Sequence, residues 1–256
     1  MTKSTMQVTF LGVGEACDPE HGNTSLLVHT GGGHFLLDCG FSVPHALFAR
    51  MADAIDLRAV WLSHFHGDHF FGLPLLLLRM WEAGRLEDLH IVGPQGVEEI
   101  VPQVMNLAYP GFWDLLTFAV HVHTLHPGQN RVLGKVSLRA AWTDHSQPNL
   151  GLRLDAAGKS LYYSGDGRPG PRTLELARGC DLMVHEGFHC EQIHHGHGTV
   201  REVMQLARDS GVQSVAVVHM HRQERKDTVD QVRQMLQNMS SVRGILPEDG
   251  EVLQLE

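Results

Sequence analysis

Short apolar runs separated by turn residues fill the first quarter of the chain, a pattern typical of β-strands. The runs that predict strands here are Gln7 to Leu11, Ser25 to His29, His34 to Asp38 and Arg58 to Leu62. The glycine-rich turn between the second and third runs predicts a hairpin. Apolar residues at helical spacing predict helices over Pro44 to Ala54 and Phe70 to Glu82.

The rest of the chain repeats this alternation. Further strands are predicted at Leu89 to Val92, Leu116 to Thr124, Val132 to Trp142, Gly151 to Asp155, Lys159 to Ser164, Leu182 to His185 and Ser214 to His219. Further helices are predicted at Gly96 to Leu107, Thr199 to Ser210 and Thr228 to Met239. Two β-rich halves, each followed by helices, predict an α/β fold in which two packed sheets carry helices outside, a four-layer α/β/β/α sandwich.

Composition supports one large core. The chain has 256 residues, 43% of them hydrophobic and 19% charged, so it can bury roughly 75% of its unfolded surface. No linker or low-complexity stretch divides it, and we expect a single domain over residues 1–256. The longest apolar run, Phe70 to Trp81, contains Pro74 and Arg79 and is too short to span a bilayer.

The charge of the chain limits which partners it can bind, and its cysteine content indicates where in the cell it is located. The formal net charge is −9, which repels phosphate backbones and argues against an extended nucleic-acid interface. The four cysteines lack C-x-x-C spacing, and the start of the chain lacks the pattern of a signal peptide. We therefore expect a reduced, cytoplasmic location and no membrane association.

Histidine is the main chemical clue, with 19 residues in the chain. The segment Ser63-His64-Phe65-His66-Gly67-Asp68-His69 places three imidazoles and a carboxylate directly after an apolar strand. Alternation directs His64 and His66 to one side, and the turn at Gly67 directs Asp68 and His69 to another. One loop can thus contribute to two neighbouring metal sites.

This H-x-H-x-D-H segment resembles the metallo-β-lactamase superfamily. Flanking segments resemble its ribonuclease Z-like phosphodiesterase branch, and the likeness extends from about residue 6 to residue 222. These segments are Leu11 to Gly14, Asn23 to Ser25, Asp38 to Gly40, Gly93 to Gly96, His145 to Ser146 with Leu150 to Gly151, and Tyr163 to Asp166. Two blocks match less closely, His185-Glu186-Gly187-Phe188 and His197-Gly198-Thr199.

The resemblance implies a metallo-β-lactamase fold and two divalent metal ions per chain. It places one ion on His64, His66 and His145, a second on Asp68, His69 and His219, and Asp166 between them. These nitrogen and oxygen ligands favour Zn²⁺ and also allow Mn²⁺ or Fe. His221 is the alternative to His219, because either imidazole of the pair can face the site.

The resemblance also implies which residues act in catalysis. They are Asp68, His197 as the general acid and Glu186 as the residue that orients His197. In the transfer-RNA-processing members of the branch, a protruding arm lies between the positions of His145 and Asp166. Only residues 146–165 separate them here, so we expect no such arm.

Two other motifs compete with this interpretation. Gly12-Val13-Gly14 can begin a dinucleotide fingerprint, but Cys17 occupies the third glycine position. His185 to His189 matches the H-E-x-x-H metalloprotease pattern, which requires a helix, whereas the preceding residues predict a strand. His194 and His195 are expected to lie in a solvated loop, and the histidines outside these motifs to be surface or strand-face residues.

The sequence thus predicts a dinuclear metal-dependent phosphodiesterase. We expect it to act on small or cyclic phosphodiesters through a metal-bridging hydroxide. Its partner would be a small-molecule phosphodiester, and a homodimer is possible. One alternative is a metal-dependent ester, thioester or lactone hydrolase on the same fold, and a less favoured one is a transfer-RNA 3′-processing endonuclease. A non-enzymatic metal-binding protein would not require this ordered histidine spacing.

Overall fold

A computed structural model describes residues 6–51 and 56–256 of the protein. Its strands form two seven-stranded sheets. The first sheet contains, in order across it, β14 (Val252–Leu255), β1 (Met6–Gly12), β2 (Ser25–Thr30), β3 (Gly33–Leu37), β4 (Leu57–Trp61), β5 (Leu89–Gly93) and β6 (Val120–Thr124). The second contains β13 (Arg243–Ile245), β12 (Ser214–Val218), β11 (Leu182–Glu186), β10 (Lys159–Tyr163), β9 (Leu150–Ala156), β8 (Val136–Trp142) and β7 (Asn130–Leu133).

Both sheets are mixed. In the first, β1 to β3 form an antiparallel meander and β3 to β6 run parallel. In the second, β7 to β10 are antiparallel and β10 to β13 parallel. Parallel neighbours need crossover connections, and helices supply several of them.

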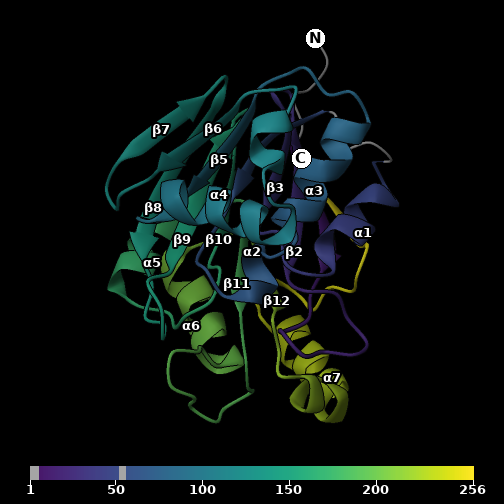
Figure 1. Ribbon diagram of the computed structural model, residues 1–256. Helices are drawn as coiled ribbons and strands as arrows, with labels where there is room; N and C mark the ends of the chain where they lie inside the picture. The colour runs from purple at the N-terminus through teal and green to yellow at the C-terminus, as the bar shows by residue number, and fades with distance from the viewer. Residues whose placement is uncertain (1–5, 52–55) are drawn as a thin grey trace.

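The helices lie on the outer faces of the sheets. They are α1 (Val43–Phe48), α2 (Gly67–Phe70), α3 (Leu73–Glu82), α4 (Val97–Ala108), α5 (Pro171–Ala177), α6 (Val200–Ser210) and α7 (Arg222–Gln237), with a 3₁₀ turn at Phe112–Leu115. Figure 1 shows α6 and α7 below the strands labelled β11 and β12, and α1 and α3 at the other side of the molecule. Among the described residues, no helix combines the length and apolar character needed to cross a membrane.

Alternation along the strands divides the apolar residues among three cores. Phe10 and Trp61 of the first sheet meet Leu152 and Val184 of the second in the core between the sheets. A second core lies under α1, α3 and α4, and a third lies under α5 to α7. The predicted four-layer α/β/β/α sandwich is therefore confirmed.

Several predicted boundaries were wrong. The helix expected over Phe70 to Glu82 begins only at Leu73, because Phe70 ends the short helix α2 and the chain turns at Phe71 and Gly72 before α3. Pro74 lies in the first turn of α3, where a proline is tolerated. The strand expected over Val132 to Trp142 is a hairpin that turns at Gly134, which has φ +62°. The first helix ends at Phe48, and the last three residues predicted for it, 52–54, lie outside the described residues.

Other differences concern the ends of elements and the C-terminus. The strand expected from Leu116 begins only at Val120, and α7 begins at Arg222, six residues before the predicted start at Thr228. Helix α5 and the strands β13 and β14 were not predicted. Strand β14 pairs antiparallel with β1, so the end of the chain completes the N-terminal sheet.

Candidate metal centre

Histidine and aspartate side chains from both sheets converge where their strands end. The loop from Ser63 to His69 follows β4, the loop with His145 follows β8, Asp166 follows β10 and His219 follows β12. These loops bring together all seven residues that the sequence predicts as metal ligands: His64, His66, Asp68, His69, His145, Asp166 and His219.

The first group contains His64, His66, His145 and Asp166. Nδ1 of His66 lies 2.9 Å from Nε2 of His64 and 3.2 Å from Nε2 of His145. Oδ2 of Asp166 lies 3.8 Å and 3.9 Å from the same two Nε2 atoms. Four donor atoms this close can surround one cation with bonds of about 2.0–2.2 Å after small adjustments.

The second group contains Asp68, His69 and His219. Oδ2 of Asp68 lies 3.3 Å from Nε2 of His69 and 3.5 Å from Nε2 of His219. Oδ1 of Asp166 completes the group, at 3.3 Å from His69 Nε2 and 3.5 Å from His219 Nε2. Asp166 therefore presents one oxygen to each group.

The backbone around Asp166 is held by neighbouring polar groups. The Asn149 side chain accepts from the Asp166 N–H at 3.3 Å and also donates to the Asp166 carbonyl. The Thr143 hydroxyl donates to the same carbonyl at 2.8 Å. These bonds fix the carboxylate between the two groups.

Two buried atoms indicate that the site fits a cation. Nε2 of His69 and Oδ1 of Asp166 are buried and have no hydrogen-bond partner among the described residues, although they lie 3.3 Å apart. Leaving a buried polar atom unsatisfied costs about 1–3 kcal/mol. A cation between them would satisfy both atoms, and the nitrogen and oxygen donors suit borderline divalent metals.

The protonation states of His64 and Asp166 suit metal binding. Burial, followed by the nearby His69, lowers the pKa of His64 well below its ordinary value, so this ring is neutral. Burial alone would raise the pKa of Asp166, but the charges of His219 and His69 outweigh it and hold this pKa well below the usual range. Burial alone would lower the pKa of His69 and of His219, but the Asp166 carboxylate outweighs it, raising the pKa of His69 and raising that of His219 to about 9. These two rings therefore have to lose a proton to bind a metal.

Asp38 supports the centre from behind, a role that the sequence alone did not reveal. Its carboxylate accepts hydrogen bonds from the Ser63 N–H and hydroxyl, both at 2.7 Å, and from the Tyr163 hydroxyl at 2.7 Å. It also lies 2.8 Å from Nδ1 of His69. A carboxylate on the far nitrogen of a ligand histidine fixes its tautomer and orientation. The signal was an aspartate at the end of a buried strand, within a segment that resembles a family block.

His197 and Glu186 form a pair next to the first group. Nδ1 of His197 lies 3.2 Å from Glu186 Oε1, which also accepts from the Gly167 N–H at 2.7 Å and the Gly198 N–H at 3.1 Å. Burial opposes the charged imidazolium, but the hydrogen bond and charge of Glu186 outweigh it, and the pKa of His197 is raised. The ring also stacks on Phe188, with centroids 4.5 Å apart.

The other histidines that the sequence offers as site residues do not belong to the two donor groups. His185 and Glu186 are on strand β11 rather than on a helix, which excludes the metalloprotease reading. His194 and His195 are exposed. His221 is the N-cap residue before α7, and its ring contacts Phe188 and His189. It belongs to none of the metal-capable groups of the described chain.

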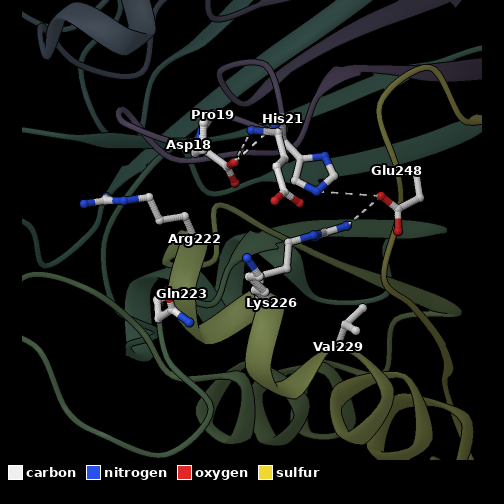
Figure 2. Close-up of a pocket in the computed structure, with 10 residues that line it drawn as sticks. Asp18, Pro19, His21, Arg222, Gln223, Lys226, Val229 and Glu248 are labelled. Carbon is white, nitrogen blue, oxygen red and sulfur yellow. Dashed lines mark hydrogen bonds and ion pairs between the residues drawn. The ribbon is translucent and has the colours of Figure 1, made fainter.

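A separate cavity of about 540 Å³ lies between the loop after β1 and the start of α7. Figure 2 shows the His21 side chain pointing toward Glu248, whereas Arg222 points away from both. His21 lies 3.9 Å and Arg225 3.1 Å from Glu248, and Asp18 accepts hydrogen bonds from the N–H groups of Glu20 and His21. This cavity contains none of the seven predicted ligands.

Solved structures share this architecture over the whole chain. The metallo-β-lactamase fold protein YhfI from Bacillus subtilis has a TM-score of 0.80 and 22% identity, with 98% of this chain and 99% of that chain covered. The short form of human tRNase Z has a TM-score of 0.78 and 24% identity, with the same coverage. The fold and site thus define a metallo-β-lactamase-fold protein.

Sequence comparisons identify the family to which the chain belongs. It is 31% identical to a ribonuclease Z of Mycobacterium bovis over 241 residues, which covers 84% of this chain and 85% of that protein. The family model described as "Anti-Pycsar protein Apyc1" matches residues 6–242, and the chain belongs to this family. The predicted resemblance to ribonuclease Z-like proteins and the assignment as a metal-dependent hydrolase are confirmed.

Proposed function

We propose that the protein is a dinuclear metal-dependent phosphodiesterase that acts on small or cyclic phosphodiesters. The observation that supports this most directly is the shared Asp166, whose two oxygens face two separate donor groups. His64, His66 and His145 would hold one ion, and Asp68, His69 and His219 the other. Their donor chemistry favours Zn²⁺, with Mn²⁺ or Fe as alternatives.

When bound, two such ions would neutralise phosphate charge and lower the pKa of an attacking water. The chain's own residues supply the rest of the chemistry. Asp166 and Asp68 would hold the ions, and Asp38 and Ser63 orient the rings of His69 and His64. No lysine or arginine is needed near the phosphate, because the metals provide the positive charge.

The leaving alkoxide must gain a proton, and His197 is the residue that we assign to this step. Glu186 accepts from Nδ1 of His197, so Nε2 can carry the proton that is donated. The raised pKa of His197 keeps this acid form present near neutral pH. Two backbone N–H groups on Glu186 Oε1 keep its carboxylate in position.

The names of the relatives raise a second candidate, transfer-RNA 3′ processing, because the sequence matches are ribonucleases Z. The stretch between His145 and Asp166 argues against it. Residues 146–165 form one loop and the hairpin of β9 and β10, which leaves no chain for a protruding arm. We therefore propose small phosphodiesters as the substrates. We also propose that the enzyme is cytoplasmic.

A turnover screen tests the proposal. Protein loaded with zinc or with manganese would be assayed on bis(4-nitrophenyl) phosphate, on 4-nitrophenyl phosphate and on a thioester, with chelator-treated protein as the control. We expect metal-dependent cleavage of the diester and little cleavage of the monoester. Faster thioester than diester hydrolysis would replace this proposal with the carbonyl-ester alternative.

A further inference from the structure

Three histidines on neighbouring strands of the first sheet form a cluster that the proposed chemistry does not use. They are His90 of β5 and His121 and His123 of β6 (Figure 1). In the parallel register of these strands, His90 lies opposite His121 and Val92 lies opposite His123. Because side chains alternate along a strand, all three imidazoles project from the same face of the sheet. They are separate from the two donor groups that share Asp166.

The cluster brings two ring nitrogens close together. Nδ1 of His90 lies 3.2 Å from Nε2 of His123. Two nitrogens at this separation, each bound to one zinc ion at about 2.0–2.1 Å, would subtend an angle of about 100–105° at the ion. That angle is close to the tetrahedral one that zinc adopts in proteins. Two ligands of a metal site are therefore already in position on adjacent strands.

His121 lies where it can supply a third nitrogen. Its ring centroid is 5.2 Å from that of His90 and 6.3 Å from that of His123. Nε2 of His121 lies 2.8 Å from Oδ2 of Asp88, so the carboxylate can accept from this nitrogen and leave Nδ1 free for a metal. The His121 side chain is 43% exposed, which gives it room to turn toward the other two rings.

The surroundings keep the two closest rings in the form that binds metals. Burial, followed by the neighbouring His121, lowers the pKa of His90. Burial, followed by Arg131, lowers the pKa of His123. Both rings are therefore neutral at neutral pH, and a metal ion does not have to displace a proton from a charged imidazolium.

Charged side chains of both signs act on the cluster. Arg58 and Arg131 lower the pKa of its rings, whereas Asp88 and Glu98 raise it. Because these charges oppose one another, affinity for a cation would come from nitrogen coordination rather than from general attraction. Imidazole nitrogens suit Zn²⁺, Cu²⁺ and Ni²⁺, whereas Mg²⁺ and Ca²⁺ prefer oxygen ligands. The cluster therefore selects a transition metal.

The first sheet carries another cross-strand pair of histidines. Nδ1 of His29 lies 3.1 Å from Nε2 of His34. In the part of the chain that the structure describes, no third histidine ring contacts this pair. The pair at His90 and His123 differs, because a third imidazole is held beside it. The pair at His29 and His34 therefore serves as a comparison.

We propose that His90, His121 and His123 form a further metal site, which binds Zn²⁺ or Cu²⁺ across β5 and β6. It differs from the candidate metal centre because its ligands are imidazoles only. Strand β6 is the last strand of its sheet, so the bound ion would fasten an edge strand to its neighbour. The site does not depend on phosphodiesterase activity, because none of its ligands belongs to the catalytic machinery.

Zinc content measured by difference tests the site. The wild type and the double variant His90→Gln/His123→Gln would be stripped with a chelator and dialysed to equilibrium against a defined concentration of free Zn²⁺. We expect the wild type to hold one ion per chain more than the double variant, because glutamine is polar but has no imidazole nitrogen. His126→Gln is the control, since His126 is an exposed histidine just beyond β6, and it should hold as much zinc as the wild type.

Copper spectroscopy tests the ligand set. An equimolar amount of Cu²⁺, added to protein whose catalytic centre is filled with Zn²⁺, should give an electron paramagnetic resonance spectrum with nitrogen hyperfine splitting. The double variant His90→Gln/His123→Gln should lose this spectrum, and His29→Gln/His34→Gln should retain it. Asp88→Asn should weaken Cu²⁺ binding by about 10- to 100-fold, because it removes the carboxylate behind His121. Circular dichroism verifies that each variant is folded.

Several outcomes would overturn the site. Equal zinc content in the wild type and in His90→Gln/His123→Gln would do so, and so would a copper spectrum that this double variant retains. Unchanged Cu²⁺ affinity in Asp88→Asn would remove His121 from the ligands. A wild type that binds the additional ion but does not cleave bis(4-nitrophenyl) phosphate would support the site and contradict the proposed function.

Discussion

Three of the five histidines of the centre, His64, His69 and His145, are oriented by a group behind the ring, so their donor atoms are arranged before any metal arrives. Asp38 contacts Nδ1 of His69 at 2.8 Å, and the carbonyl of Gly196 accepts from Nδ1 of His145 at 2.7 Å. The hydroxyl of Ser63 lies 3.0 Å from Nδ1 of His64. In these three rings Nδ1 is engaged, which leaves Nε2 free to bind a metal. His219 differs, because its buried Nδ1 has no hydrogen-bond partner among the described residues.

The contact between Asp38 and His69 is therefore expected to control metal affinity. Asp38→Asn should weaken metal binding by about 10- to 100-fold while the protein stays folded, measured by competition with a chelator. Asp181→Asn is the matched control, because Asp181 also accepts from the N–H and hydroxyl of one serine, Ser160, in another part of the fold. Equal affinities in the two variants would remove Asp38 from this role.

The role of His197 as the general acid can be tested by comparing the rates of hydrolysis of diesters with different leaving groups. His197→Ala should slow hydrolysis of an alkyl phosphodiester by about 10²- to 10⁴-fold, with much less effect on a nitrophenyl diester, whose leaving group needs little protonation. His195→Ala, an exposed histidine of the same loop, is the control. Similar losses on both diesters would show that His197 does not donate the proton.

The pH dependence of the activity is expected to follow from the pair formed by His197 and Glu186. Glu186 raises the pKa of His197, so the acid form persists to higher pH than in an isolated histidine. Activity on the alkyl diester should then decline as the pH rises through the raised pKa. Glu186→Gln should move this decline to lower pH, which a pH profile of kcat/KM would reveal. A shift to higher pH would be inconsistent with this arrangement.

At the scale of elements, the sequence predicts the strands far better than their connections. Strands such as β4 and β12 are short and mostly apolar, a pattern typical of strands buried in an α/β fold. The breaks at Gly72 and Gly134 depend on how the neighbouring segments pack, which no local pattern encodes. Strand β14 pairs with β1, about 245 residues away, so its partner is beyond any local signal.

For the candidate site too, local patterns in the sequence are predictable and long-range contacts are not. The loop from His64 to His69 is visible in the sequence because its spacing is local, and the remaining ligands were found only through the resemblance. Asp38 was not assigned a role, because its importance arises from the folded surroundings of His69. Long-range packing supplies that information.

The loop that carries Asp166 allows a test of packing at the site. A Cβ atom on Gly165, which has φ +57°, would lie 2.6 Å from Asn149 Oδ1 and would collide with Ser63. Gly165→Ala should therefore lower the free energy of unfolding by about 2 kcal/mol or more. Gly158 has φ +75° and open space around it, so Gly158→Ala should show only the backbone strain, about 1 kcal/mol. Equal losses in denaturant unfolding would contradict this account.

At the scale of the whole molecule, the net charge and the short hairpin between His145 and Asp166 support the proposed preference for small substrates. The net charge is −9, and the residues from 146 to 165 are fully used by a loop, β9 and β10. Recognition of a folded RNA needs many lysine and arginine contacts to phosphates, and each adds to the salt dependence of binding. Between His145 and Asp166, the chain is taken up by a loop, β9 and β10, and no segment remains there for such contacts.

We therefore expect efficient cleavage of small phosphodiesters together with poor processing of precursor transfer RNA. Affinity for transfer RNA should be weak and should change little between about 50 and 200 mM salt, because few phosphates are contacted. The assay compares kcat/KM on a cyclic nucleotide with removal of the 3′ trailer from a precursor, with a ribonuclease Z as the positive control. Tight binding that weakens steeply with salt, together with accurate trailer removal, would instead assign the protein to transfer-RNA maturation, and the substrate would have to reach the metal centre without an arm.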